Sequence, residues 1–72
     1  MDNLYSAKKN AVYNLIRVPD IGLLKNLGLS RGTTVAIRER YALGGPVLLN
    51  VEDSFDVAIG KDIAVQITVG PL

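Results

Sequence analysis

The sequence has no cysteine and no histidine. Without cysteine, neither a disulfide framework nor a thiolate metal site is available. Without histidine, the chain lacks the usual general base, and it also lacks the strong nucleophile that a thiolate would supply. Transition metals in proteins usually bind histidine with carboxylate, or thiolate, and neither set can be assembled here. We therefore predict no catalytic residue, no cofactor and no transition-metal site.

The sequence also lacks a long apolar segment and a strong excess of charge. Its N-terminus, MDNLYSAKKN, has no apolar core of a signal peptide, and no apolar run approaches the roughly 20 residues that span a bilayer. Eight basic and seven acidic residues nearly cancel, which gives no strong attraction to nucleic acid or anionic lipid. We expect a soluble, cytoplasmic protein that reaches the inner face of a membrane only through a partner.

A length of 72 residues and an apolar fraction of 49 % indicate one compact domain over residues 1–72. We expect residues 1–3 and 70–72 to fray.

The stretch LLKNLGLSRG, residues 23–32, predicts a short helix that runs into a turn. Leucines at three- and four-residue spacing give the helix, at about 20–27, one apolar side. Asp20 is the predicted cap of its first turn. Gly28 supplies the left-handed conformation that ends many helices, which lets Leu29 fold back onto the helix. A turn centred on Ser30-Arg31 follows, with Gly32 at a position that favours glycine.

Alternating apolar and polar residues predict strands at about 11–18, 33–40, 47–51, 55–59 and 66–69. In the second strand, Thr33, Val35 and Ile37 should be buried, whereas Thr34, Ala36, Arg38 and Arg40 should face water. In the next two strands, the expected inward residues are Val47, Leu49, Val51, Phe55, Val57 and Ile59, and Leu48 and Asn50 should point outward.

The segments between these strands predict turns. Gly44, Gly45 and Pro46 mark one loop, residues 52–54 form a hairpin turn, and a helical turn is expected near 60–64. Short strands joined by tight turns, with one small helix, predict a closed or nearly closed barrel of about five or six antiparallel strands.

Two groups of residues are candidate ligand sites. Glu52, Asp53 and Asp56 form an oxygen-only set that suits magnesium or calcium better than iron, but hairpin turns commonly carry such residues. Neither glycine-containing turn has the spacing of a phosphate-binding loop. Arg31, Arg38 and Arg40 are the basic residues that an oligonucleotide would need, although neighbouring acidic residues dilute their charge.

Partner docking is the function that the residues favour. Leu23, Tyr41, Leu43 and Leu48 are apolar residues at predicted loop or outward positions, where aromatic and aliphatic groups make good interface anchors. Arg31, Arg38 and Arg40 would tune association. Weak self-association, by the same surface or by pairing of edge strands, is an alternative use.

An ordered set of residues resembles the FeoA family of bacterial ferrous iron uptake. The set comprises Leu24, Leu27-Gly28-Leu29, Gly32, Val35, Ile37, Gly45-Pro46-Val47, Leu49, Val51, Ile59, Ala64, Ile67 and Val69. The resemblance implies a mainly β, SH3-like barrel and transition metal ion homeostasis. The chain departs from the usual pattern at Leu23 and Asn26, which make the helix surface less charged, and at Ser54, where a glycine is common.

The resemblance also implies a non-enzymatic accessory protein that docks on the cytosolic part of a FeoB-like membrane transporter and modulates its assembly or gating. The same domain type ends the metal-dependent repressors of the DtxR kind, so a metal-responsive regulatory interaction domain is the alternative. A nucleic-acid-binding barrel is a third hypothesis for the function.

Overall fold

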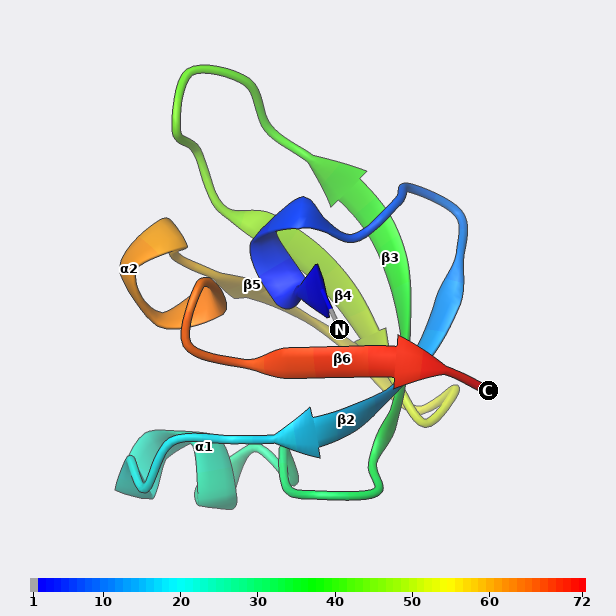
Figure 1. Cartoon of the computed structure of the whole chain (residues 1–72), viewed down its shortest axis with the longest axis vertical. Coiled ribbons are helices and arrows are strands. Elements are labelled where there is room, and N and C mark those ends of the chain that lie inside the picture. Colours follow the sequence, from blue (N-terminus) through cyan, green and yellow to red (C-terminus); the bar gives the residue numbers. More distant parts are fainter. Residues whose placement is uncertain (1) are drawn as a thin grey trace.

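The computed structural model describes residues 2–72, which form six strands, two short α-helices and one 3₁₀ segment (Figure 1). The strands are β1 (Asp2–Asn3), β2 (Val12–Arg17), β3 (Thr34–Arg40), β4 (Val47–Val51), β5 (Phe55–Ile59) and β6 (Thr68–Pro71). The helical segments are η1 (Leu4–Ser6), α1 (Gly22–Asn26) and α2 (Lys61–Ala64).

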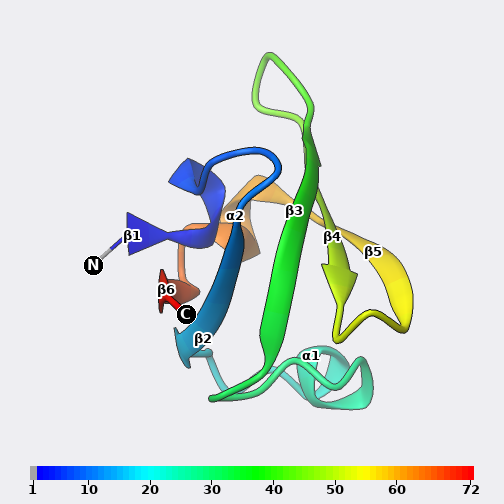
Figure 2. The same ribbon diagram turned by 90° about the vertical axis from the view of Figure 1, so that its right-hand side faces the viewer.

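All strands belong to one antiparallel sheet in the order β1-β6-β2-β3-β4-β5, which curls around the core (Figures 1 and 2). The edges of the sheet are therefore β1 and β5. The segment η1 follows β1 and contacts α2, which follows β5, so the segments next to these two edge strands meet. This architecture confirms the predicted mainly β, SH3-like barrel.

The core lies inside the curled sheet, where alternate side chains of the strands meet α1 and α2. Its buried members are Leu4, Ala7, Leu15, Leu24, Leu29, Val35, Ile37, Val47, Leu49, Val51, Ile59, Ala64, Ile67 and Val69. Because successive side chains of a strand point to opposite faces, this set follows from the alternation in the sequence. In β2, whose two faces are both largely apolar, Leu15 is the buried residue.

The helix α1 begins later than predicted, and the prediction that Asp20 caps it is wrong. The residue before the helix is Ile21, in extended conformation, and no side chain caps the first turn. The Ile21 N–H donates instead to the Pro19 carbonyl at 2.8 Å, which delays the helix. The Asp20 carboxylate pairs with Lys25 Nζ at 2.9 Å, and both side chains are largely exposed.

The end of α1 is as predicted. Gly28 has a φ of +76°, and the Leu29 N–H donates to the Leu24 carbonyl at 2.9 Å while the Gly28 N–H donates to the Lys25 carbonyl at 3.0 Å. These two bonds define a Schellman motif, which turns the chain back so that Leu29 is buried on Leu24. The next turn runs from Ser30 to Thr33, one residue later than predicted, with Gly32 (φ +91°) in its centre.

A β-bulge in β3 changes which face of the sheet its last residues occupy, so the prediction for these residues is wrong. Ile37 lies opposite Leu49, but Glu39 rather than Arg38 lies opposite Leu48, and Arg40 lies opposite the buried Val47. The extra residue reverses the alternation beyond Ile37. Arg38 and Arg40 are therefore both exposed but point to opposite faces of the sheet, and the predicted shared face is wrong.

Three further side chains differ from their predicted places. Phe55, expected inward, is 41 % exposed because it starts the edge strand β5. Asn50, expected outward, is only 8 % exposed, and its Nδ2 donates to Asp56 Oδ1 at 3.0 Å. Leu48 is partly buried rather than fully outward.

The chain ends carry ladder pairs at the positions where fraying was expected. Asp2 and Asn3 lie opposite Val69 and Thr68, and Pro71 lies opposite Tyr13. The expectation for Met1 lies outside the described residues.

Candidate docking surface

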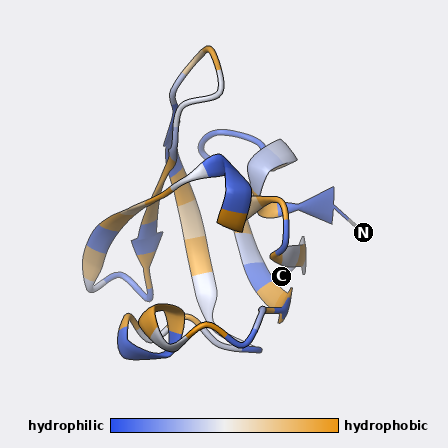
Figure 3. Ribbon diagram, turned by 90° about the vertical axis from the view of Figure 1, so that its left-hand side faces the viewer, coloured by the Kyte–Doolittle hydropathy of each residue, from blue (hydrophilic) through white to orange (hydrophobic). Residues whose placement is uncertain are grey.

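The tip of the β3–β4 hairpin is the most unusual surface of the described chain. It protrudes beyond the barrel, and its hydrophobic colour stands out against a paler loop (Figures 2 and 3). Leu43 at the tip is fully exposed (104 %), and Tyr41 is 51 % exposed. We call Tyr41, Leu43 and the turn around them the hairpin tip. The sequence prediction that Tyr41 and Leu43 are presented to solvent agrees with this exposure.

The backbone of the hairpin tip is bent tightly. Leu43 and Gly44 have φ values of +59° and +77°, and the Gly45 N–H donates to the Ala42 carbonyl at 3.2 Å. Two left-handed residues in succession are typical of a type I′ turn. Gly44 adopts this conformation at little cost, whereas a leucine does so rarely and with strain.

Position 45 requires glycine for a steric reason. A Cβ added there would lie 2.8 Å from Tyr41 Cβ, too close for any real contact. The Tyr41 N–H also donates to the Pro46 carbonyl at 3.1 Å, which closes the base of the loop. The predicted turn residues Gly44, Gly45 and Pro46 thus all take part in the turn of the hairpin tip.

The end of β3, at the base of the hairpin tip, contacts the N-terminal segment of the chain. Arg40 Nη2 donates to the Tyr5 carbonyl at 2.7 Å, and its guanidinium lies 5.9 Å from the centre of the Tyr5 ring. Lys61 Nζ lies 5.4 Å from the same ring, and Lys9 pairs with Glu39 at 3.1 Å. The contacts of Tyr5 with Arg40 and Lys61 were not predicted from the sequence, because nothing local relates residues so far apart.

The predicted docking residues do not form one surface. Leu23, 59 % exposed, lies on α1 at the opposite end of the barrel from the hairpin tip (Figure 2). Arg31 lies near α1, where it lines a groove of about 330 Å³ together with Lys25 and Leu29. Arg38 lies at the bulge, with its Nε 3.7 Å from Asp56 Oδ1. Tyr41 and Leu43 lie at the hairpin tip, and Arg40 and Leu48 lie near its base, where Leu48 is opposite Glu39.

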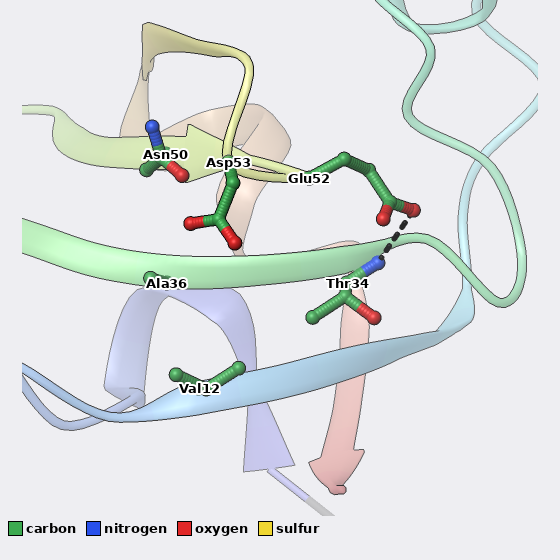
Figure 4. A pocket seen from close by; sticks show the side chains of 6 residues that line it. All are labelled: Val12, Thr34, Ala36, Asn50, Glu52 and Asp53. Atoms are coloured by element: carbon green, nitrogen blue, oxygen red, sulfur yellow. Dashed lines mark hydrogen bonds between the residues drawn. The ribbon is translucent and has the colours of Figure 1, made fainter.

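A second groove, of about 220 Å³, crosses the outer face of β2, β3 and β4 (Figure 4). Its lining residues are Val12, Thr34, Ala36, Asn50, Glu52 and Asp53. Glu52 Oε1 accepts a hydrogen bond from the Thr34 N–H at 3.1 Å, and the Glu52 N–H donates to the Thr34 carbonyl at 3.0 Å. This carboxylate therefore secures the left-handed turn at Glu52 and Asp53 (φ +51° and +56°).

Within residues 2–72, no group of three or more histidine, cysteine or acidic side chains is arranged to hold a metal ion. None of the described helices is long and apolar enough to cross a membrane.

The curled six-stranded sheet defines a small SH3-like barrel that carries an exposed apolar hairpin tip. The family model of the FeoA domain matches residues 3–71, and the chain belongs to this family. FeoA proteins are small accessory proteins involved in ferrous iron transport and are not known as enzymes.

Solved structures share the fold. The crystal structure of an iron uptake regulatory protein (FeoA) is 24 % identical with a TM-score of 0.86, over 99 % of this chain and 96 % of that one. The FeoA protein from Chlorobium tepidum is also 24 % identical with a TM-score of 0.85, over 97 % and 70 %. ScaR with bound Zn²⁺ is 26 % identical with a TM-score of 0.86, and this chain spans only 37 % of its length. No curated protein matches the chain significantly.

Proposed function

We propose that this protein docks on the cytosolic part of a FeoB-like ferrous iron transporter and modulates the transporter's assembly or gating, without chemistry of its own. The observation that carries the proposal is the fully exposed Leu43 on a hydrogen-bonded hairpin tip in a chain of the FeoA family. The place of action is the cytoplasm, at the inner face of the membrane through the transporter.

The hairpin tip has the properties of an interface anchor. Its turn, its glycine-dependent packing and the Arg40–Tyr5 bond hold it in place before binding, so little conformational freedom is lost on docking. An exposed leucine that becomes fully buried contributes about 2 kcal/mol. Tyr41 adds a half-exposed aromatic ring, a residue type enriched at the centres of interfaces.

The first test is a pull-down with the soluble cytosolic domain of the FeoB-like transporter. The double variant Tyr41→Ala with Leu43→Ser should bind more weakly and remain folded, because both side chains are largely outside the core. The matched control is Leu23→Ser, which removes an exposed leucine at the opposite end of the barrel. Capture of the double variant at wild-type strength, with and without guanine nucleotide, would contradict the proposal.

The alternative function is a metal-responsive regulatory interaction domain. The likeness to ScaR favours it, since a barrel of this kind makes up about a third of that longer chain. Calorimetry with Fe(II), Mn(II) and Zn(II) separates the two functions. Docking predicts no stoichiometric binding by the isolated chain, whereas micromolar one-to-one binding of one of these ions would favour the regulatory domain. Strong salt-dependent retention on single-stranded oligonucleotides would instead support a nucleic-acid-binding barrel.

A further inference from the structure

The edge strand β5 is open along its outer side. Within residues 2–72, β5 pairs only with β4, and no further backbone hydrogen bond reaches its central residues, Asp56 and Ala58. The strand spans five residues without proline or bulge, whereas the other edge strand, β1, spans two. Natural proteins usually protect such edges with charges, prolines or bulges, because an open edge can pair with another chain.

The alternation of hydrogen bonds along the strands shows which backbone groups of β5 have no partner among the described residues. The Glu52 N–H points to β3, where it donates to the Thr34 carbonyl. Alternate residues of a strand point their backbone N–H and C=O groups to opposite neighbouring strands. The Val51 N–H therefore points to β5, where Val51 lies opposite Phe55. Residues 55, 57 and 59 therefore direct their backbone groups to β4, and Asp56 and Ala58 direct theirs outward from the sheet.

The one charge on this strand does not protect the edge. Asp56 Oδ1 accepts a hydrogen bond from Asn50 Nδ2 at 3.0 Å and lies 3.7 Å from Arg38 Nε. Both partners come from strands on the inner side of β5, so the carboxylate is drawn back over the sheet and its charge is partly offset. Ala58, the other outward-directed residue, is exposed and offers no steric barrier.

We propose that a second copy of this chain pairs antiparallel with β5 about a twofold axis through Val57, which joins two barrels into one continuous sheet. In this register Asp56 lies opposite Ala58 of the second copy, and the free N–H and C=O groups of the two residues bond each other. Phe55, 41 % exposed in the single chain, lies opposite Ile59. The two Asp56 carboxylates become diagonal neighbours across the seam, where each stays bonded to Asn50 and close to Arg38 of its own chain.

The dimer is weak, because the paired segment is short and lies at the low end of interface sizes. It therefore forms at high local concentration and leaves the hairpin tip free. The proposal does not depend on transporter docking.

Amide hydrogen exchange at two protein concentrations, about 0.05 mM and about 2 mM, tests the edge directly. The Asp56 and Ala58 amides should become more protected in the concentrated sample, whereas the Val57 amide, bonded to β4, should be protected equally in both. Unchanged exchange of Asp56 and Ala58 would overturn the proposal.

Two substitutions at one position test the register. Ala58→Lys places a cation opposite Asp56 of the second copy and should tighten the dimer about fivefold, and Ala58→Asp should weaken it about fivefold, because two such cross-strand pairs form per dimer. The matched controls, Ala42→Lys and Ala42→Asp, make the same changes at an exposed alanine of the hairpin loop and should leave the dimer unchanged. Sedimentation equilibrium measures all four, and effects of the same sign for both Ala58 variants would overturn the register.

Discussion

Replacing Leu43 by asparagine should raise the stability of the protein and weaken its docking at the same time. Leu43 has a φ of +59° and a side chain that contacts solvent on all sides, so its folded-state contacts contribute little. Asparagine adopts the left-handed conformation several-fold more often than other residues, which corresponds to about 0.5–1 kcal/mol in favour of the folded state. For a domain of this size, that gain should raise the midpoint of thermal unfolding by about 3–6 °C.

The effect on docking has the opposite sign. Burial of a leucine side chain contributes about 2 kcal/mol, so Leu43→Asn should weaken binding of the transporter's cytosolic domain about 30-fold. Thermal unfolding and isothermal calorimetry on the same preparation measure both quantities.

The control is Leu23→Asn on α1. This substitution should lower stability slightly, since asparagine is a poorer helix former than leucine, and should leave docking unchanged. A Leu43→Asn variant that is less stable than the wild type would refute the argument from backbone strain. A variant that docks with wild-type affinity would refute the role of the hairpin tip.

Three substitutions elsewhere test the account of the fold by denaturant unfolding. Leu24→Ala should cost about 3 kcal/mol, because the side chain is fully buried between α1 and the sheet, and a loss below about 1 kcal/mol would show that the core is loosely packed. Gly28→Ala should cost about 1–2 kcal/mol, since φ is +76° there, and a neutral result would contradict the Schellman geometry. Asp20→Ala should change stability by less than about 0.5 kcal/mol, because its only partner is the exposed Lys25, and a loss of about 1 kcal/mol or more would restore its role as a cap.

The sequence predicted the parts of the fold that depend on local pattern. Alternation placed Val35, Leu49 and Val69 in the core, and Gly28 ended the helix, because the period of a strand and the conformational freedom of glycine are properties of a few neighbouring residues.

The sequence did not predict features that depend on neighbouring strands. The bulge at Arg38 leaves no mark in the alternation, yet it moves Arg40 to the face of the sheet where it binds Tyr5. Asn50 is buried because Asp56 on the next strand satisfies its amide, which its own position in β4 does not reveal. Such pairings appear only once the register is known.

The candidate site was predicted in part. Tyr41 and Leu43 were recognised because they are large apolar residues in a predicted loop. Leu23 was grouped with them, but in the structure α1, which carries Leu23, and the hairpin tip lie at opposite ends of the barrel. The left-handed conformation of Leu43 was missed, because turn type depends on how the flanking strands twist.

The most direct test of docking is an NMR titration of the isotope-labelled protein with the soluble cytosolic domain of the FeoB-like transporter from the same organism. The account predicts shifts concentrated at residues 40–46, at Tyr5, which contacts Arg40, and at Lys61, which contacts the Tyr5 ring. Resonances of α1 should stay in place. A titration that leaves residues 40–46 unshifted, or that shifts α1 alone, would contradict it.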